Sequence, residues 1–301
     1  MMRKLGEFML RSQGQEVLVL TLAMVMSVFI SPLSYLLSGT PLALLALRKG
    51  PAKCIKSAVI ALMVLSLGIG LVVPVAMQVV MVFALMIWIP VLCMSVTLRT
   101  SESQAMMLIL AAVMAVLITV SIHWSLGDVE GWWREMVLGW IGTEKQTKEA
   151  VDLREAMLGI VPFMNAFMMG AVTANMIISV LVARWWQAQM FFPGAFKKEF
   201  LSIRLPLGLL MVLVIALLLS LTDGSSWQSL AKDIVAIITV VYSFEGIARI
   251  HRGVSEKGRG RYVLTLMYVL IVFMTPQMVA LLGLLGIVDS LNKRPQKNGH
   301  D

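Results

Sequence analysis

The amino-acid sequence predicts an all-α protein, a polytopic transmembrane helix bundle with about eight to nine membrane segments, one of which is a short broken helix. Of its 301 residues, 59% are hydrophobic and only 14% are charged, against roughly 25% charged in soluble domains. The mean hydropathy is +0.87. Uncharged stretches near or above the roughly 20 residues that span a bilayer recur along the chain. They cover residues 17–47, 57–98, 103–127, 156–183, 205–222 and 262–288, with a weaker stretch at about 227–248.

The first stretch, residues 17–47, has an unusual length. As a helix it would measure about 46 Å, too long for one crossing and too short for two. It contains Ser31-Pro32 and the run from Ser38 to Pro41. We therefore expect one full helix, followed by a broken half-length helix that returns to the same side. Such a break can line a binding cavity, or it can be a proline-kinked structural hairpin.

The next stretches predict three ordinary crossings. Residues 57–98 would be about 63 Å long as a helix, which is enough for two. Pro74 follows Gly68 and Gly70 and supplies the break between them. Residues 103–127 are expected to form one further crossing.

The polar loop at 123–156 is expected on the outer side. Trp133, Val137, Trp140 and Ile141 share one helical face, so we expect a helix that lies on the outer leaflet. The run from Thr143 to Gln146 fits the capping box of the following helix. The aromatic residues can form an interfacial belt or a lid over an outward-facing cavity.

Residues 156–183 predict the crossing with the most polar side chains. Ala166, Gly170 and Ala174 repeat every four residues and predict a face for close helix packing. Asn165 and Asn175 also lie in this crossing, and buried amides in a membrane need partners. They can bond other helices or contact a ligand, and both interpretations stay open.

Residues 184–204 predict a cytoplasmic amphipathic connector. Arg184, Trp185 and Trp186 are typical of the inner membrane interface. After Pro193-Gly194, aromatic and basic residues alternate at helical spacing and predict a short helix. It can anchor the chain to the inner leaflet or dock a partner protein. The residues concerned are Phe196, Lys197, Lys198 and Phe200.

The C-terminal part predicts additional membrane helices over residues 205–288. The stretch near 227–248 is the weakest, and it ends at Glu245, which lies four residues before Arg249 and can pair with it. A carboxylate near membrane depth is a candidate functional residue, although it can also reach the interface. Pro276 makes residues 262–288 either one tilted crossing or a hairpin. Residues 289–301 are expected to be a polar tail.

The distribution of charge predicts the orientation of the chain. The segments assigned to the cytoplasm carry 17 basic and 6 acidic residues, and those assigned to the outside carry 5 and 9. This asymmetry follows the positive-inside rule and places the N-terminus in the cytoplasm. It also accounts for the net charge of +8, so binding to nucleic acid is not expected.

Recognisable sites for chemistry are missing from the sequence. The two cysteines and three histidines are scattered, so neither a metal site nor a cofactor is expected. The phosphate-binding, zinc-protease and hydrolase motifs are absent. The sequence therefore predicts a protein that is not an enzyme, with an intramembrane enzyme as an open alternative.

Three segments together resemble the YybS-like family of bacterial integral membrane proteins. The most specific runs from Arg184-Trp185-Trp186-Gln187 through Pro193-Gly194, Phe196 and Glu199-Phe200 to Arg204-Leu205. The other two are residues 41–50, which end in Arg48-Lys49-Gly50, and residues 286–290. The resemblance covers most of the chain and implies a multi-pass protein of the bacterial inner (cytoplasmic) membrane.

That family is distantly similar to the S components of energy-coupling-factor transporters and to the rod-shape protein MreD. The resemblance implies a six-helix core over residues 1–183, with the connector 184–204 and the additional helices 205–288 after it. The chain departs from S components because it lacks a recognisable vitamin-binding motif. Its additional helices could also cover the surface on which a transporter partner docks.

Two functions are compatible with these patterns. The first is a component that binds or transports a small solute or lipid precursor, with Asn165, Asn175 and Glu245 in one cavity. The second is a non-catalytic scaffold or assembly factor that recruits partner proteins through the segment Phe196–Arg204. The expected surroundings are the lipid bilayer and a membrane or cytoplasmic protein partner. The sequence does not identify the small-molecule ligand.

Overall fold

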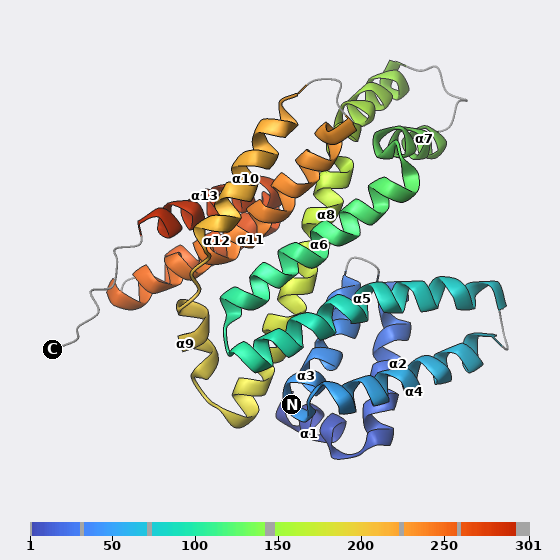
Figure 1. The fold of residues 1–301 in the computed structure, drawn as a ribbon, viewed down its shortest axis with the longest axis vertical. Coiled ribbons are helices and arrows are strands. Elements are labelled where there is room, and N and C mark those ends of the chain that lie inside the picture. Colours follow the sequence, from blue (N-terminus) through green and yellow to red (C-terminus); the bar gives the residue numbers. More distant parts are fainter. Residues whose placement is uncertain are drawn as a thin grey trace. The chain divides into compact units, whose positions relative to one another are not determined.

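The computed structural model describes residues 2–30, 33–70, 74–141, 148–222, 226–257 and 260–292. All regular structure in these residues is helical (Figure 1), so the predicted all-α class is confirmed. Contacts divide the chain into two units. Unit 1 comprises residues 1–111 and 174–203, and unit 2 comprises residues 112–173 and 204–301.

Unit 1 holds the first part of the chain and the connector. Its helices are α1 (Met2–Arg11), α2 (Gln13–Phe29), the π-helix η2 (Tyr35–Gly39), α3 (Thr40–Lys49), α4 (Pro51–Gly70), α5 (Pro74–Ser101) and α9 (Ala195–Leu201). Two further helices, α6 (Gln104–Leu126) and α8 (Lys148–Phe191), begin in one unit and end in the other.

The predicted short second helix is present as η2 and α3. Within it, the run from Ser38 to Pro41 is a π-helical turn that passes directly into α3. Trp88 donates its indole N–H to the Ser38 hydroxyl at 2.7 Å, which holds this turn against α5. Pro41 lies in the first turn of α3, where a missing N–H costs no hydrogen bond. Ser31-Pro32 lies outside the described residues.

Helix α3 is the buried centre of unit 1. All six residues from Leu42 to Leu47 are buried, as expected for a helix that is apolar on every side. It contacts η2, α4 and α5. Its last carbonyl groups are therefore held inside the protein, where they need donors from other helices.

Most of the predicted crossings of the first half correspond to helices. Residues 57–98 correspond to parts of α4 and α5, which pack against each other; α4 ends at Gly70 and α5 begins at Pro74. The predicted helix in the outer loop is α7 (Val129–Ile141). Residues 143–146 of the proposed capping box lie outside the described residues.

Helix α8 is much longer than the predicted crossing 156–183. It has 44 residues and therefore a length of about 66 Å, roughly twice the bilayer core. Hydropathy marks only the apolar middle of such a helix, because helical structure continues into the polar ends. The chain leaves α8 at Phe191 and turns at Gly194, whose φ of +87° is accessible mainly to glycine.

The C-terminal helices lie in unit 2. They are α10 (Leu207–Ser220), α11 (Ser226–Lys257), α12 (Arg261–Phe273) and α13 (Thr275–Leu291). The segment predicted to be the weakest crossing is thus part of the 32-residue helix α11, which continues past Glu245. Residues 262–288 are divided between α12 and α13, and Pro276 lies in the first turn of α13. The stretch is therefore interrupted at Met274, and the choice between a tilted crossing and a hairpin stays a prediction.

Glycines allow α11 and α13 to pack closely. A Cβ atom at Gly246 would collide with the backbone carbonyl of Leu282, and one at Gly286 would collide with that of Tyr242. Backbones approach this closely only where side chains are absent, and small residues have this function in membrane helix pairs. Gly170, from the predicted packing face on α8, lies against α11: a Cβ atom there would be 3.5 Å from the Val240 side chain.

Five helices in the described part of the chain are long and apolar enough to cross a membrane. They lie within α4, α5, α6, α8 and α11, and the bent pair α1 and α2 makes a sixth candidate. Helices α10, α12 and α13 are apolar but shorter. The protein is therefore a helical membrane protein, and the expected eight to nine segments include these short helices. The predicted division at residues 183 and 204 stays a prediction.

Candidate functional site

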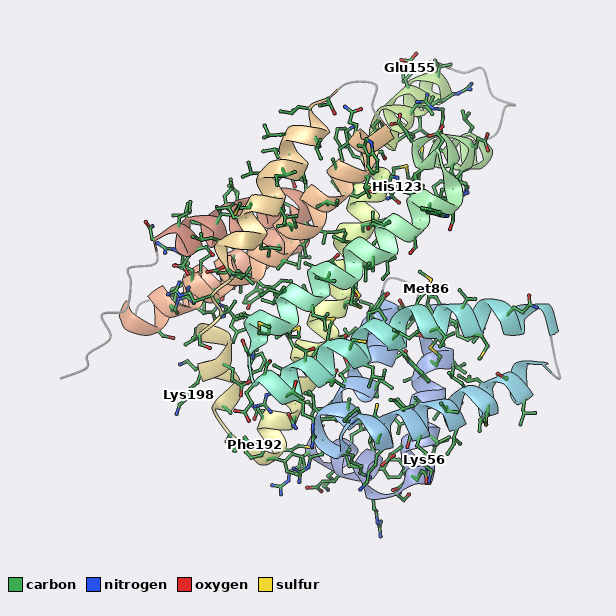
Figure 2. All side chains as sticks on the ribbon, in the orientation of Figure 1. Lys56, Met86, His123, Glu155, Phe192 and Lys198 are labelled. Atoms are coloured by element: carbon green, nitrogen blue, oxygen red, sulfur yellow. The ribbon has the colours of Figure 1, made fainter. Side chains whose placement is uncertain are left out.

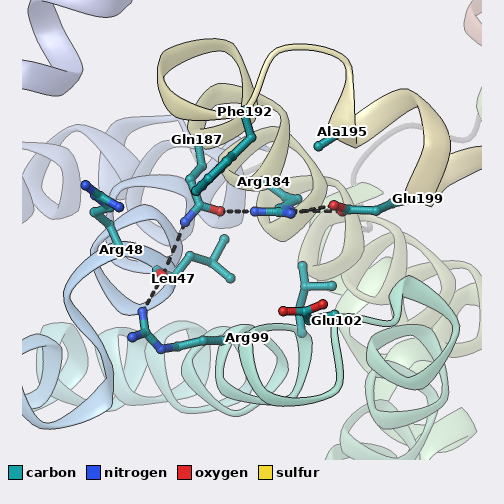
Figure 3. A pocket seen from close by; sticks show the side chains of 10 residues that line it. Leu47, Arg48, Arg99, Glu102, Arg184, Gln187, Phe192, Ala195 and Glu199 are labelled. Atoms are coloured by element: carbon teal, nitrogen blue, oxygen red, sulfur yellow. Dashed lines mark hydrogen bonds and ion pairs between the residues drawn. The ribbon is translucent and has the colours of Figure 1, made fainter.

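A pocket of about 410 Å³ lies in unit 1, next to the C-terminal end of α3 (Figure 3). Its lining combines charged side chains with apolar ones from α3, α5, α8 and α9 and their ends. The lining residues are Leu47, Arg48, Leu98, Arg99, Glu102, Arg184, Gln187, Phe192, Ala195 and Glu199. Two of the segments that carry the resemblance, Arg48-Lys49-Gly50 and the Arg184–Glu199 block, meet here.

One wall of the pocket is a network centred on Arg184. Its Nε donates to Oε2 of Glu199 at 2.9 Å, and its NH2 group contacts Oε1 of the same carboxylate. Its NH1 group donates to the Gln187 side chain at 2.5 Å. The Nε2 group of Gln104 adds a longer bond to Glu199 at 3.4 Å. This two-pronged ion pair joins the end of α8 to α9 across the turn at Gly194, with the geometry that suits an arginine and a carboxylate.

A second wall is built on the carbonyl group of Leu47. Arg99 from α5 donates to it at 2.5 Å, and Gln187 from α8 donates at 3.3 Å. Leu47 lies in the last turn of α3, whose carbonyl groups have no partner within the helix. Gly50 ends the helix with a φ of +90°, and a Cβ atom there would lie 3.8 Å from the Arg99 guanidinium. The positive φ, rather than a lack of space, therefore favours glycine at this turn.

The pocket carries an excess of positive charge. Three arginines line it, and two glutamates, Glu102 and Glu199, oppose them. Arg184 is committed to Glu199 and Gln187. Within the described residues, Arg99 donates only to Leu47, while Arg48 lies over the Phe191 ring at 4.0 Å and has no ion pair. The guanidinium groups of Arg48 and Arg99 therefore keep donors that an anionic group could accept.

The predicted connector residues lie around this pocket. Arg184 is part of its wall, Trp186 is buried and Trp185 is half-exposed. The rings of Phe196 and Phe200 stack on α9 with their centres 5.8 Å apart. Lys197 and Lys198 are exposed, and Figure 2 shows Lys198 on α9 and Phe192 at the preceding turn.

The three predicted ligand-binding residues lie outside this pocket. Asn165 belongs to unit 2 and Asn175 to unit 1. Glu245 is fully buried in unit 2, where Oε2 accepts from the backbone N–H of Leu205 at 3.0 Å and from the Ser290 hydroxyl at 2.8 Å. The expected partner of Glu245, Arg249, instead donates to Asp289. Whether the three residues bind a ligand stays a prediction.

Asn165 is part of a buried polar cluster that the sequence did not reveal. Oδ2 of Asp233 contacts Nε2 of His123 at 2.7 Å and accepts from the Asn165 amide at 2.5 Å. The indole N–H of Trp133 donates to Asn165 at 3.4 Å. The cluster thus joins α6, α7, α8 and α11, and Figure 2 marks His123 on α6. These residues are far apart in sequence, so spacing gave no signal.

Within the described residues, no three His, Cys, Asp or Glu side chains are grouped so that they could hold a metal ion. Among the pocket residues that were not predicted from the sequence, Arg48 and Arg99 had the clearest signal. Both lie at the basic ends of predicted helices. Their common acceptor is a backbone carbonyl, which a side-chain pattern cannot show.

A comparison with protein families gave one match. The family described as "Predicted membrane protein (DUF2232)" matches residues 142–290, just under half of the chain. The matched part includes Arg184, Gln187 and Glu199 of the pocket and excludes Arg48 and Arg99. No significant match was found among curated proteins or among solved structures.

Proposed function

We propose that the protein binds an anionic small solute or lipid precursor through the pocket of unit 1, as the binding component of a transport system. The observation that carries this proposal is the pair Arg48 and Arg99. Both line a pocket of about 410 Å³, and both keep guanidinium donors that no described residue accepts. A phosphate or carboxylate matches this donor geometry and the excess of positive charge.

The surroundings of the two arginines support a binding role. Arg99 is fixed by the Leu47 carbonyl, and the adjoining wall is fixed by the Arg184–Glu199 pair. A site held this way loses little freedom when a ligand binds, which favours affinity. The basic charge of the flanking segments supports a cytoplasmic position for this end of unit 1. The sequence has no ATP-binding motif, so ATP-driven transport would require a partner chain.

Native mass spectrometry of the full chain, purified gently from its own membranes, tests this function. The wild-type protein should carry a small molecule that contains phosphate or carboxylate. The double variant Arg48→Gln/Arg99→Gln should lose it. Lys53→Gln/Lys56→Gln is the matched control, since both lysines are exposed on the neighbouring helix and do not line the pocket. A wild-type protein without such a molecule, or equal retention in the double variant, contradicts the proposal.

The scaffold function rests on a different observation. Helix α9 presents the exposed Lys197 and Lys198 beside a stacked pair of phenylalanines. A seven-residue helix of this kind can take part in a protein interface. It is the second candidate, and a charge-reversal experiment given below separates it from the first.

A further inference from the structure

Unit 2 contains a second concentration of arginine, around Asp289. Arg249 donates to Oδ1 of this carboxylate at 2.6 Å, and Arg204 and Arg252 contact Oδ2. The three arginines come from the segment before α10 and from α11, and the aspartate comes from α13. One carboxylate therefore faces three guanidinium groups.

The side chains of the three arginines differ in solvent exposure. The side chain of Arg252 is 16% exposed and that of Asp289 only 7%, so this pair is interior. The side chains of Arg204 and Arg249 are 44% and 42% exposed. Each uses part of its guanidinium group on Asp289 and turns the remainder outward. Arg252 alone can neutralise Asp289, so the outer pair adds positive charge beyond what this carboxylate requires.

The segment that carries Arg204 is fixed in place. The backbone N–H of Leu205 donates to Glu245, the Leu205 carbonyl accepts from Ser290 at 3.3 Å, and the Pro206 carbonyl accepts from Tyr242 at 3.4 Å. The two residues after Arg204 are thus tied to α11 and α13. Glu245 is buried and accepts the first of these bonds. Counted together, the three arginines exceed the two carboxylates, Asp289 and Glu245, by one positive charge.

Lipid-facing surface begins directly beside these arginines. Helix α10 starts three residues after Arg204 and consists of apolar residues and one glycine up to Ser220. Most of its large side chains are exposed, among them Leu207, Met211 and Leu218. In a membrane protein such a surface contacts acyl chains. Arg204 and Arg249 therefore lie where the headgroup of a lipid packed against α10 would be.

We propose that Arg204 and Arg249 bind the phosphate of an anionic phospholipid, whose acyl chains lie along α10. The guanidinium fork suits a phosphate oxygen pair, and basic pockets at the cytoplasmic ends of membrane helices bind anionic headgroups. The occupant is a lipid because the charge adjoins an apolar surface. This site is in the other unit and does not depend on the function proposed for the pocket of unit 1.

Native mass spectrometry of the full chain with added phosphatidylglycerol or phosphatidylcholine tests the site. Wild-type protein should retain one phosphatidylglycerol more tightly than phosphatidylcholine. Arg204→Gln/Arg249→Gln should weaken this binding about fivefold for each charge removed. Arg252 remains in this variant to neutralise Asp289. Arg204→Lys/Arg249→Lys keeps the charge and should retain more binding than the glutamine variant.

A variant that is expected to bind the lipid more tightly distinguishes a binding site from a purely structural network. Asp289→Asn removes the carboxylate that competes with the lipid, so phosphatidylglycerol should bind more tightly, whereas a purely structural network would only be weakened. Arg48→Gln/Arg99→Gln is the control and should leave this lipid in place. Equal binding of both lipids, unchanged binding in Arg204→Gln/Arg249→Gln, or wild-type occupancy by inorganic phosphate without lipid would overturn the proposal. If Asp289→Asn does not fold, the arginine variants decide.

Discussion

Arg184 on α8 and Glu199 on α9 form a two-pronged ion pair, with Nε bonded to Oε2 at 2.9 Å and NH2 in contact with Oε1. Both side chains are about one-fifth exposed. The pair holds the seven-residue helix α9 against the end of α8 and so fixes one wall of the pocket. Helix α9 is too short to be stable by itself, and its position therefore depends on this contact.

Breaking this pair should loosen α9. Arg184→Gln and Glu199→Gln should each lower the free energy of unfolding by about 1–3 kcal/mol, because each leaves a partly buried charge without its partner. The double variant should lose less than the sum of the two, since the pair interacts directly. Thermal unfolding in detergent measures this. The Arg3–Glu7 pair is the control, because it has a similar distance but is exposed and should contribute little. Strict additivity would contradict the expectation.

The glycines between α11 and α13 should not accept a side chain. Gly286→Ala places a Cβ atom against the Tyr242 carbonyl, so the two helices must separate and thermal stability must fall. Gly253→Ala on α11 is the matched control, because no atom lies within 4 Å of its added Cβ. That change should be neutral or stabilise by up to about 1 kcal/mol. Equal midpoints for the two variants would show that close packing here is unimportant.

Single and paired substitutions in the cluster around Asp233 should change the free energy of unfolding by non-additive amounts. Asn165→Leu removes one donor from a carboxylate that is only 1% exposed, which should cost about 1–3 kcal/mol. Asp233→Leu removes the carboxylate that needs this donor but also takes the partner of His123 away. The double variant should therefore lose less stability than the sum of the two single variants. Unfolding midpoints of the three variants provide the measurement, and strictly additive losses would be inconsistent with this reasoning.

Charge reversal on α9 distinguishes binding from scaffolding. Lys197→Glu/Lys198→Glu changes two exposed residues that do not line the pocket. If binding is the function, the small molecule seen by mass spectrometry should remain. If the protein is a scaffold, a complex purified with the wild-type chain should dissociate. Loss of the complex with no bound molecule in any sample would favour the scaffold.

The sequence predicted the helical architecture better than the ends of its helices. Each of the five described helices long enough to cross a membrane overlaps a predicted apolar stretch, and Pro74 is the first residue of α5. The run from Ser38 to Pro41 suggested the irregular short helix, but not its π-helical form, which Trp88 holds from another helix. Helices α8 and α11 exceeded their predicted limits because hydropathy does not report helix beyond the apolar core.

The candidate sites were predictable only in part. The Arg184 block pointed to an important segment, but nothing in its spacing identified Glu199 as the partner of Arg184. Asp289 gave no signal, since its contact with Arg204 joins residues 85 positions apart. Such pairings depend on tertiary structure, and a single sequence shows the charges without showing which of them meet.

The most direct test of the binding function is an experimental structure of the full chain, isolated gently from its own membranes, at a resolution that shows side chains. We predict density for an anionic group between Arg48 and Arg99, at hydrogen-bond distances of about 2.7–3.2 Å from their guanidinium groups. A pocket in which these two arginines instead bind protein carboxylates, or which is filled by an acyl chain, would contradict the proposed function.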